Sequence, residues 1–584
     1  MPQSEKSELY KQMMEKLNEF NPQSWKDIDA ILMQLKKPLE SRQVTGTHAF
    51  PKEIKNGIAF ITYDYGIDGV SIEMTKYATS LQNFVFQNTE PKIHFIGGDF
   101  YPQAETIIKP EWEKFHLRGS NGWGKWENAF WYDQLFNEEM SQNSQQSDKL
   151  AREIWKQAVS LSQRLGKYLA ENNIGLLFPV NICSNPGNLA LGLCIPLVTE
   201  GMDLYVLNSN HDYYWEGGKP ATEKKFGEMS GPRDHFFRNY ENHDFFSFFE
   251  KLYPWNGAKW IQTNINKLQS DRLIDKYHFN PTKVFELATS ISNDFFTNYT
   301  KEDVKSVRLR MAHILSDGHP IIHPQAVKKH LANLGHWMKN QKPVVCTCSE
   351  NLELNPTTDE TIYLLQPTRV IGRKRIEKDV ELIGALLQHQ SFRKEFDNNS
   401  KKQIILHITG PVPIEHQHDL EVILNAFTAL CEELPQSVSN RLFLAFSVGT
   451  EEHPVFPEKG FDRLFIHDIY QLATAIVFPS ETEGRGLPIV ESSAGGIPII
   501  CSRYFPVEVF DGVVGKTMSE EEQIKYTLFP EDDFSVDFLN RVTDLLLYPE
   551  KNKKINEHNQ TAVKKRYSEA VMDANLQDLL SKFD

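Results

Sequence analysis

Two glutamates bracket a short glycine-rich loop in the C-terminal half of the chain. Glu483 and Glu491 have seven residues between them, and residues 484–487 read Gly-Arg-Gly-Leu. A buried strand is predicted to end at Phe478, and Pro488 fits the first position of a helix, where its missing N–H costs nothing. The backbone N–H groups of the loop are then expected at a helix N-terminus, which is a position that binds phosphate or diphosphate. Taken alone, a glutamate in a first helical turn can equally be a surface residue that complements the helix dipole.

Basic residues follow the strand that is predicted at residues 361–366. Arg369 and Lys374 are five residues apart, and Arg373 and Lys378 have the same spacing. Ligands of open α/β sheets bind at the carboxyl ends of the strands, so either pair could face an anion there. We favour the first pair because Arg369 ends the strand directly, but the sequence leaves the register open. The alternative is a solvated helix start, although positive charge at a helix N-terminus is unfavourable.

Three loops of the N-terminal half carry further candidate residues. They are Gly66 and Gly69 after a strand at 57–63, Asn181, Ser184 and Asn188 after a strand at 174–178, and His211 and Asp212 after a strand at 203–208. The glycine turn can be a phosphate loop or a plain tight turn. The asparagine loop can bind a substrate, or it can form an Asx turn with a helix cap. The His-Asp pair can be catalytic, or it can be a solvated turn.

The residues around the glycine-rich loop resemble the donor-binding signature of the retaining glycosyltransferases of family 4. The matching residues are Pro479, Ser480, Glu483, Gly484, Gly486, Leu487, Pro488 and Glu491. The resemblance covers residues 360–570 well and residues 57–290 loosely. It implies the GT-B fold, in which two Rossmann-like, doubly wound domains face each other across a cleft.

The resemblance also implies roles for the candidate residues. Arg369 and Lys374 would bind the donor diphosphate, and His211 would approach the donor sugar as a catalytic residue. Glu491 would accept from ribose hydroxyls and Glu483 from hydroxyls of the transferred sugar; a nucleophilic role for Glu483 is the alternative that the resemblance disfavours. The other donor-binding candidates are Gly66, Gly69, Gly410, Gly484, Arg485, Gly486 and Leu487. The acceptor-binding candidates are Asn181, Asn188, Asp212, Arg233 and His235.

The pattern of elements predicts an α/β protein in four parts. Residues 1–50 read as two amphipathic helices that extend the first domain. Residues 51–345 and 355–560 alternate strands with helices, which predicts two doubly wound sheets. We expect the first of these domains to bind the acceptor and the second to bind the nucleotide sugar. Residues 561–584 resemble the segment that, in this fold, packs back on the N-terminal domain.

Composition excludes several classes of protein. There are 63 Lys and Arg against 78 Asp and Glu, a net charge of −15, and no basic block, which argues against binding of nucleic acid or of a membrane surface. The longest apolar run, residues 189–198, is too short to span a bilayer. The first residues lack the apolar region of a secretory signal, and the six cysteines have no metal-ligand spacing. We therefore expect a cytoplasmic protein with buried thiols and no metal.

These features predict a retaining glycosyltransferase that moves a hexosyl group, glucose by default, from a nucleotide-diphosphate sugar to a small soluble acceptor. No Asp-x-Asp pair lies in a suitable loop, so we expect Arg369, Lys374 and the loop amides to neutralise the leaving diphosphate. No cofactor is expected beyond the nucleotide sugar as co-substrate. The alternatives are a nucleotide-sugar-binding protein without activity and a phosphorylase-like enzyme of the same fold. A homo-oligomer is compatible with the sequence.

Overall fold

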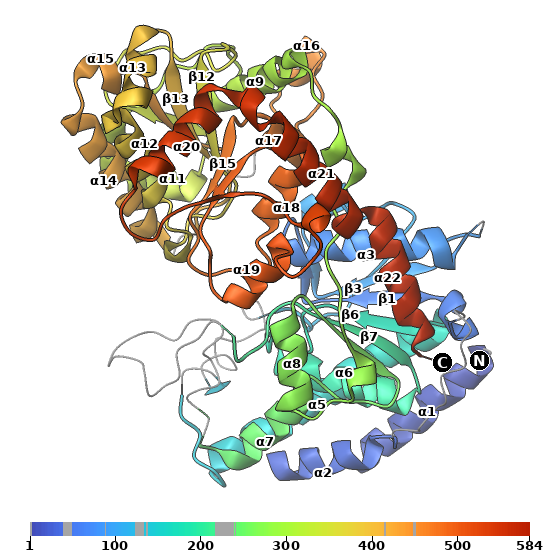
Figure 1. The fold of residues 1–584 in the computed structure, drawn as a ribbon. Helices are drawn as coiled ribbons and strands as arrows, with labels where there is room; N and C mark the ends of the chain where they lie inside the picture. Colours follow the sequence, from blue (N-terminus) through green and yellow to red (C-terminus); the bar gives the residue numbers. More distant parts are fainter. Residues whose placement is uncertain are drawn as a thin grey trace. The chain divides into compact units, whose positions relative to one another are not determined.

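A computed structural model shows that the chain forms two compact α/β units (Figure 1). It describes residues 3–38, 50–87, 89–122, 134–135, 138–216, 239, 241–413, 416–447 and 451–583. Unit 1 comprises Met1–Ser290 and Glu569–Asp584, and unit 2 comprises Ile291–Ser568.

Unit 1 is built around a seven-stranded parallel sheet in the order β5-β3-β1-β6-β7-β8-β9. The strands are β1 (Ile58–Ile61), β3 (Ile93–Gly97), β5 (Glu113–His116), β6 (Leu176–Pro179), β7 (Tyr205–Asn210), β8 (Trp260–Asn264) and β9 (Val284–Glu286). The helices are α1 (Gln3–Glu19), α2 (Trp25–Leu35), α3 (Gly69–Val85), α5 (Gln145–Glu171), α6 (Leu189–Gly201), α7 (His243–Leu252), α8 (Lys267–Asp275) and α22 (Glu569–Ser581). A second, two-stranded sheet pairs β2 (Asp64–Tyr65) with β4 (Asp99–Phe100).

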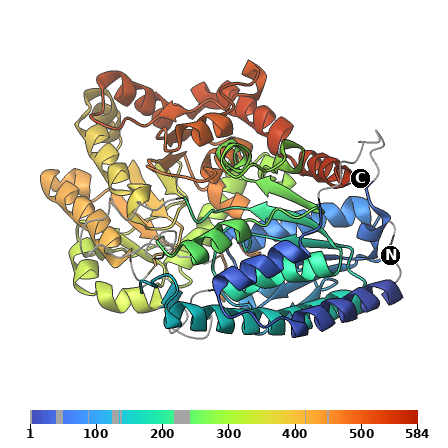
Figure 2. The same cartoon turned by 90° about the horizontal axis from the view of Figure 1, so that it is seen from below.

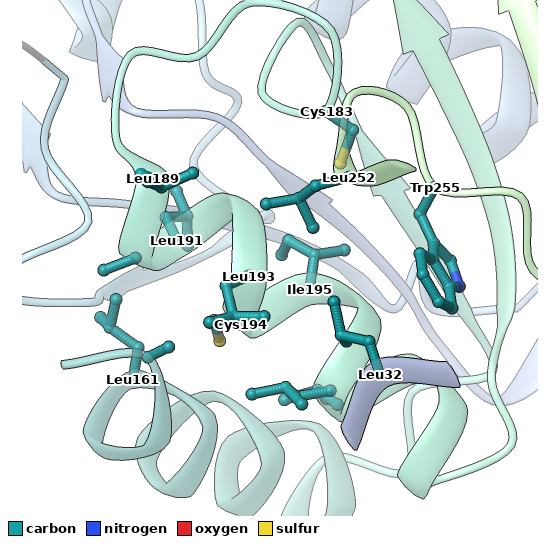
Figure 3. Packing of buried hydrophobic residues seen from close by; sticks show 14 of the residues in the cluster. Leu32, Leu161, Cys183, Leu189, Leu191, Leu193, Cys194, Ile195, Leu252 and Trp255 are labelled. Atoms are coloured by element: carbon teal, nitrogen blue, oxygen red, sulfur yellow. The ribbon is translucent and has the colours of Figure 1, made fainter. Parts of the chain in front are cut away.

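Helices cover both faces of this sheet. Successive residues of a strand point to opposite faces, so Ala59 and Ile61 join one apolar cluster while Ile58 and Phe60 join another. The first cluster includes side chains of α1, α2, α5, α6 and α7, and the second includes side chains of α3 and α22. Figure 3 shows the leucines of α6 packed in the first cluster. The apolar run at residues 189–198 is therefore a buried core helix.

The two N-terminal helices belong to unit 1. Helix α2 begins with a capping box, in which Ser24 and Asp27 satisfy each other's backbone N–H groups, and it buries Trp25. Helix α1 packs along α5, and α2 packs against α5, α6 and α7. The two N-terminal helices are the dark blue ribbons in Figure 2. Among the described residues, no helix combines the length and the apolar character that a membrane span requires.

Unit 2 is built around an eight-stranded sheet in the order β10-β11-β14-β13-β12-β15-β16-β17. Only the β11–β14 pair is antiparallel among the described pairs of this sheet. The strands are β10 (Gln325–Ala326), β11 (Val344–Thr347), β12 (Thr361–Gln366), β13 (Gln403–Ile408), β14 (Leu442–Phe446), β15 (Ala475–Phe478), β16 (Ile499–Cys501) and β17 (Thr527–Leu528). The helices are α9 (Lys301–Leu315), α10 (Val327–Ala332), α11 (Leu334–Asn340), α12 (Glu377–Gln388), α13 (Gln390–Asn398), α14 (Gln417–Glu433), α15 (Gln436–Ser439), α16 (Phe456–Lys459), α17 (Ile466–Gln471), α18 (Leu487–Ala494), α19 (Val507–Val514), α20 (Val536–Leu547) and α21 (Lys553–Tyr567).

The division between the units differs from the boundaries expected from the sequence. The sequence pattern places residues 291–345 in the first domain, but they belong to unit 2. Arg308 of α9 donates from Nε and Nη2 to the carbonyl of Leu472, at 3.1 and 2.9 Å. The chain returns to unit 1 at Glu569, eight residues later than the expected boundary at 561, and α22 packs on α3. Such polar contacts between distant segments leave no mark on the local hydropathy from which the boundaries are predicted.

The cysteines also differ from the expectation of buried, reduced thiols. Cys348, which follows β11, is joined by a disulfide to Cys431 of α14. The other four cysteines are free and buried. The two partners are 83 residues apart in the chain, so no local spacing pattern could have revealed the pair.

Candidate functional site

The glycine-rich loop of unit 2 has the predicted strand–turn–helix context. Strand β15 ends at Phe478 and α18 begins at Leu487, with Pro488 in its first turn. Gly486 caps the helix with φ of +62°, in the left-handed region that glycine adopts without strain. A Cβ atom at Gly486 would also lie 2.2 Å from the hydroxyl of Tyr504, so no larger residue fits there. The first N–H groups of a helix have no acceptor within it, which leaves this end suited to an anion.

A buried ion pair lies at the start of this loop. The ammonium of Lys374 donates to Oε1 of Glu483, and the two side chains are only 9% and 10% exposed. Burial lowers the pKa of Lys374 from its usual 10.5, whereas the Glu483 carboxylate raises it and Arg373 and Arg369 lower it further. The pair therefore places a cation and a carboxylate together beside the N-terminus of α18.

Backbone hydrogen bonds hold three distant segments together around the ion pair. The N–H of Glu481 donates to the carbonyl of Arg373 at 2.8 Å, and the Arg373 guanidinium donates to the carbonyl of Thr482 at 3.2 Å. The N–H of Glu483 donates to the carbonyl of Phe505 at 2.9 Å, and that of Phe505 donates to the carbonyl of Glu481 at 2.7 Å. Both members of the ion pair are thus carried on backbone that is fixed by neighbouring segments.

The geometry distinguishes the two registers of basic residues. Lys374 contacts Glu483, whereas the ammonium of Lys378 donates to the carbonyl of Glu531. Arg369 is exposed, and the charge of its guanidinium lowers the pKa of Lys374. A Cβ atom at Gly410 would lie 2.1 Å from the carbonyl oxygen of Thr368, so Gly410 allows the loop after β13 to approach the backbone beside Arg369. Lys374 rather than Lys378 therefore accompanies the glycine-rich loop. Both arginines lower the pKa of Lys374, and it is the Arg373 guanidinium that contacts the loop, at the carbonyl of Thr482.

The second glutamate of the loop lies on α18. Tyr470 of α17 donates its hydroxyl to Oε2 of Glu491. The Tyr470 side chain is almost completely buried, and burial together with the nearby carboxylate raises the pKa of Tyr470 well above its usual value. Glu491 therefore has a fixed neighbour that holds one of its oxygens.

The His-Asp turn of unit 1 follows β7, as predicted. His211 is 8% exposed, and its carbonyl accepts from the side-chain amide of Gln269 at 3.1 Å. Asn181 lies beside the turn with a positive φ of 60°, accepts from the N–H of Asp212 at 2.8 Å and donates to its carboxylate at 3.3 Å. Ser184 donates to the same asparagine at 3.4 Å. Three of the candidates, Asn181, Ser184 and Asp212, thus form one hydrogen-bonded cluster at the turn that carries His211.

A network of buried amides, which the sequence did not reveal, lies on β7, the strand that leads to this turn, and on its neighbour β8. Asn208 donates to Gln262 at 2.7 Å, and Asn210 donates to Asn264 at 3.2 Å. Tyr213 closes the network by donating its hydroxyl to Asn264 at 2.7 Å. The signal available in the sequence was the spacing of two residues on each strand, which places both amides of a strand on one face.

Two other groups of candidates have structural partners. Asn188 caps α6: its oxygen accepts from the N–H of Leu191 at 3.0 Å, and its amide nitrogen donates to two carbonyls at 2.9 Å. This is the helix-cap alternative that the sequence left open. At the glycine turn, Gly66 and Gly69 flank the cap of α3, whose first N–H groups donate to the carboxylate of Asp68. A Cβ atom at Gly69 would meet no heavy atom within 4 Å. Arg233 and His235 lie outside the described residues.

The two mainly parallel sheets and the strand–turn–helix loop define a class of fold, the GT-B fold of glycosyltransferases, as predicted. A crystal structure of a glycosyltransferase from Rickettsia africae ESF-5 superposes on this chain with a TM-score of 0.50, at 12% identity, over 90% of this chain and 98% of that one. The crystal structure of WaaG, a glycosyltransferase involved in lipopolysaccharide biosynthesis, gives a TM-score of 0.48, at 12% identity, over 90% and 99% of the two chains. At these identities, the likeness shows the fold alone.

Comparison of sequences adds one partial match. A curated protein of Sulfolobus islandicus rod-shaped virus 1, named uncharacterized glycosyltransferase 335, is 29% identical over 149 residues, which is 24% of this chain. The match spans 42% of the length of that relative. No protein-family model matches the chain.

Proposed function

We propose that the protein is a retaining, metal-independent glycosyltransferase, similar to those of family 4, that transfers a hexosyl group from a nucleotide-diphosphate sugar to a small soluble acceptor. The observation that carries this proposal is the buried contact between Lys374 and Glu483 beside the N-terminus of α18. The cation and the N–H groups at the helix N-terminus can bind a diphosphate, and the carboxylate can accept a hydrogen bond from a sugar hydroxyl. The GT-B fold and the partial match to a protein named as a glycosyltransferase support the same class of reaction.

In this proposal, the ion pair separates when the donor binds. The Lys374 ammonium and the Arg369 guanidinium take the diphosphate, and the loop amides add neutral donors. Fixed charges and dipoles that face a developing negative charge typically contribute more to catalysis than any other single effect. Glu483 then accepts from a hydroxyl of the transferred sugar, and Glu491 accepts from ribose hydroxyls. No metal is required for the diphosphate to leave.

The transfer itself proceeds on one face of the sugar. The bond from the anomeric carbon to the donor phosphate breaks, the acceptor oxygen forms its bond to the same face, and a phosphate oxygen takes the proton of the acceptor hydroxyl. His211 orients the sugar in this scheme. Asn181 and Asp212 are the candidates for binding the acceptor, because the side chain of Asn188 caps α6. We propose the cytoplasm as the compartment of the nucleotide-sugar co-substrate, and not on the basis of the thiols, because the Cys348–Cys431 disulfide is not typical of a reducing compartment. No other cofactor is needed in this scheme.

The proposal is tested with purified protein and three donors, UDP-glucose, GDP-mannose and ADP-glucose, each in the presence of EDTA. Release of a nucleoside diphosphate upon addition of small sugars, polyols or organic acids is the expected result, and the anomeric configuration of the product, read by NMR, reports retention. Tight binding of a donor without release of the nucleoside diphosphate in the presence of any acceptor would indicate a nucleotide-sugar-binding protein and not a transferase. Release of a sugar phosphate that requires inorganic phosphate would indicate the phosphorylase-like alternative.

A further inference from the structure

An exposed aromatic ring lies directly beside the loop that carries Glu483. Tyr504 and Phe505 follow β16 as neighbours, and their side chains are in opposite environments: Tyr504 is 1% exposed and Phe505 is 58% exposed. Successive side chains of extended backbone point to opposite sides, so the buried tyrosine requires the phenylalanine to face outward. Single exposed apolar residues are common on protein surfaces, so exposure alone assigns no role to Phe505.

What distinguishes Phe505 is how firmly its backbone is held to the candidate site. Its N–H donates to the carbonyl of Glu481 at 2.7 Å, its carbonyl accepts from the N–H of Glu483 at 2.9 Å, and it pairs with Thr482 in an isolated parallel bridge. On one side, the Tyr504 ring contacts Phe510, with ring centroids 5.2 Å apart. On the other side, the next residue, Pro506, is the N-cap of α19. The backbone that carries the Phe505 ring is therefore fixed by hydrogen bonds to the loop of Glu483.

The groups around this backbone have complementary preferences for a ligand. Glu483 can accept from hydroxyl groups, Lys374 can bind an anion, and an exposed aromatic ring binds apolar surface. A hexosyl group joined to a diphosphate presents all three features, because the C–H groups of a pyranose form an apolar face beside its hydroxyls. Binding sites for small molecules commonly combine an apolar wall with a few placed polar groups.

We infer that Phe505 is a specificity-determining residue whose ring packs against the C–H face of the transferred sugar while Glu483 accepts from its hydroxyls. This inference rests on the proposed function. It assigns the recognition of the sugar, as distinct from that of the nucleotide, to the segment after β16. A donor whose axial hydroxyl interrupts the apolar face is expected to lose this contact.

Calorimetric titration of the full chain tests the inference without an acceptor. The probes are the donor that wild type binds among UDP-glucose, GDP-mannose and ADP-glucose, and the matching nucleoside diphosphate. Phe505→Ala is expected to weaken binding of the nucleotide sugar by roughly 3- to 10-fold while leaving the nucleoside diphosphate unchanged. Phe505→Trp is expected to restore the affinity. Tyr548→Ala, which removes another exposed aromatic ring of unit 2, is the matched control and is expected to change neither affinity.

Three results would overturn the inference. Equal affinity of wild type and Phe505→Ala for the nucleotide sugar would show that the ring makes no contact with the sugar. An equal loss for both ligands, accompanied by a lower melting temperature, would show that Phe505 only supports the loop. Failure of wild type to bind any of the three donors would overturn the proposed function together with this inference, whereas the first two results leave the proposed function intact.

Discussion

The ammonium of Lys374 and the carboxylate of Glu483 form a buried ion pair although 109 residues separate them in the chain. Burying two opposite charges is costly unless each satisfies the other, so such a pair is weak evidence for stability. Its position at a glycine-rich helix start suits it to binding a ligand. Lys374 can bind the diphosphate of a nucleotide sugar, and Glu483 can accept from a hydroxyl of the sugar in the same ligand.

Removal of the Lys374 ammonium should abolish most of the transfer. We expect Lys374→Ala to lower kcat by roughly 100-fold or more, the range found when one donor to a developing negative charge is deleted. The matched control is Lys378→Ala, because Lys378 has the competing spacing but bonds to the carbonyl of Glu531. Rates of nucleotide release check both variants. Equal losses in the two variants would contradict the assignment of Lys374.

Neutralisation of Glu483 should impair the use of the sugar. Glu483→Gln keeps the size of the side chain but removes its charge, so we expect a strong fall in transfer with the fold retained. Glu481→Gln, two residues earlier on the exposed side of the same loop, is expected to retain activity near that of wild type. Initial rates and circular dichroism of both variants make the comparison. Near-normal turnover of Glu483→Gln would refute the role of the carboxylate.

Donor affinity should fall in alkaline solution below the pH expected for an ordinary lysine. Burial lowers the pKa of Lys374 from 10.5, and only the charged form attracts a diphosphate. Because Glu483 raises this pKa, Glu483→Gln should move the loss of affinity to a still lower pH. Lys374→Arg, which stays charged, should remove the alkaline loss. Titrations with UDP between pH 7 and about 10.5 follow the effect.

The lowered pKa of Lys374 also determines the direction in which this residue changes the folding stability as the pH rises. With a folded-state pKa below that of the unfolded chain, the unfolded state binds more protons between the two values, so this group makes folding more favourable as the pH rises through that window. Lys374→Met should remove this contribution. Urea unfolding of wild type and variant at several alkaline pH values measures it, and a contribution of opposite sign would contradict the lowered pKa.

The disulfide should contribute measurably to the stability of unit 2. Closing a loop of 83 residues corresponds to roughly 4.5 kcal/mol in the chain-entropy model. We therefore expect dithiothreitol, or the double change Cys348→Ser with Cys431→Ser, to lower the melting temperature. Thiol titration of the unfolded, unreduced protein should find four free thiols. A count of six would restore the sequence-based expectation of a fully reduced chain.

The local features of the candidate site could be predicted because they depend on neighbouring residues. A left-handed glycine, a proline in the first turn and a buried strand before them specify the loop from 478 to 488 without any distant contact. The alternation of strands and helices likewise predicts two parallel sheets. The His-Asp turn was found for the same reason, because it directly follows β7.

Other features depend on which segments meet. Asn188 was a candidate ligand, but in the structure its oxygen accepts from the N–H of Leu191 and its amide nitrogen donates to the carbonyls of Gly119 and Asn121. The buried amides of β7 and β8 could not be recognised locally, because only the pairing of the two strands brings them into contact.

Short-range sequence patterns thus determined the α/β class, the glycine loop, the two glutamates and the candidate cations, because backbone preference and hydrophobic periodicity act over a few residues. Only the tertiary structure decided that Lys374 and not Lys378 meets Glu483, that Cys348 bonds to Cys431, and that residues 291–345 belong to unit 2. Each of these depends on a contact between segments far apart in the chain. No pattern within either segment encodes the position of its partner.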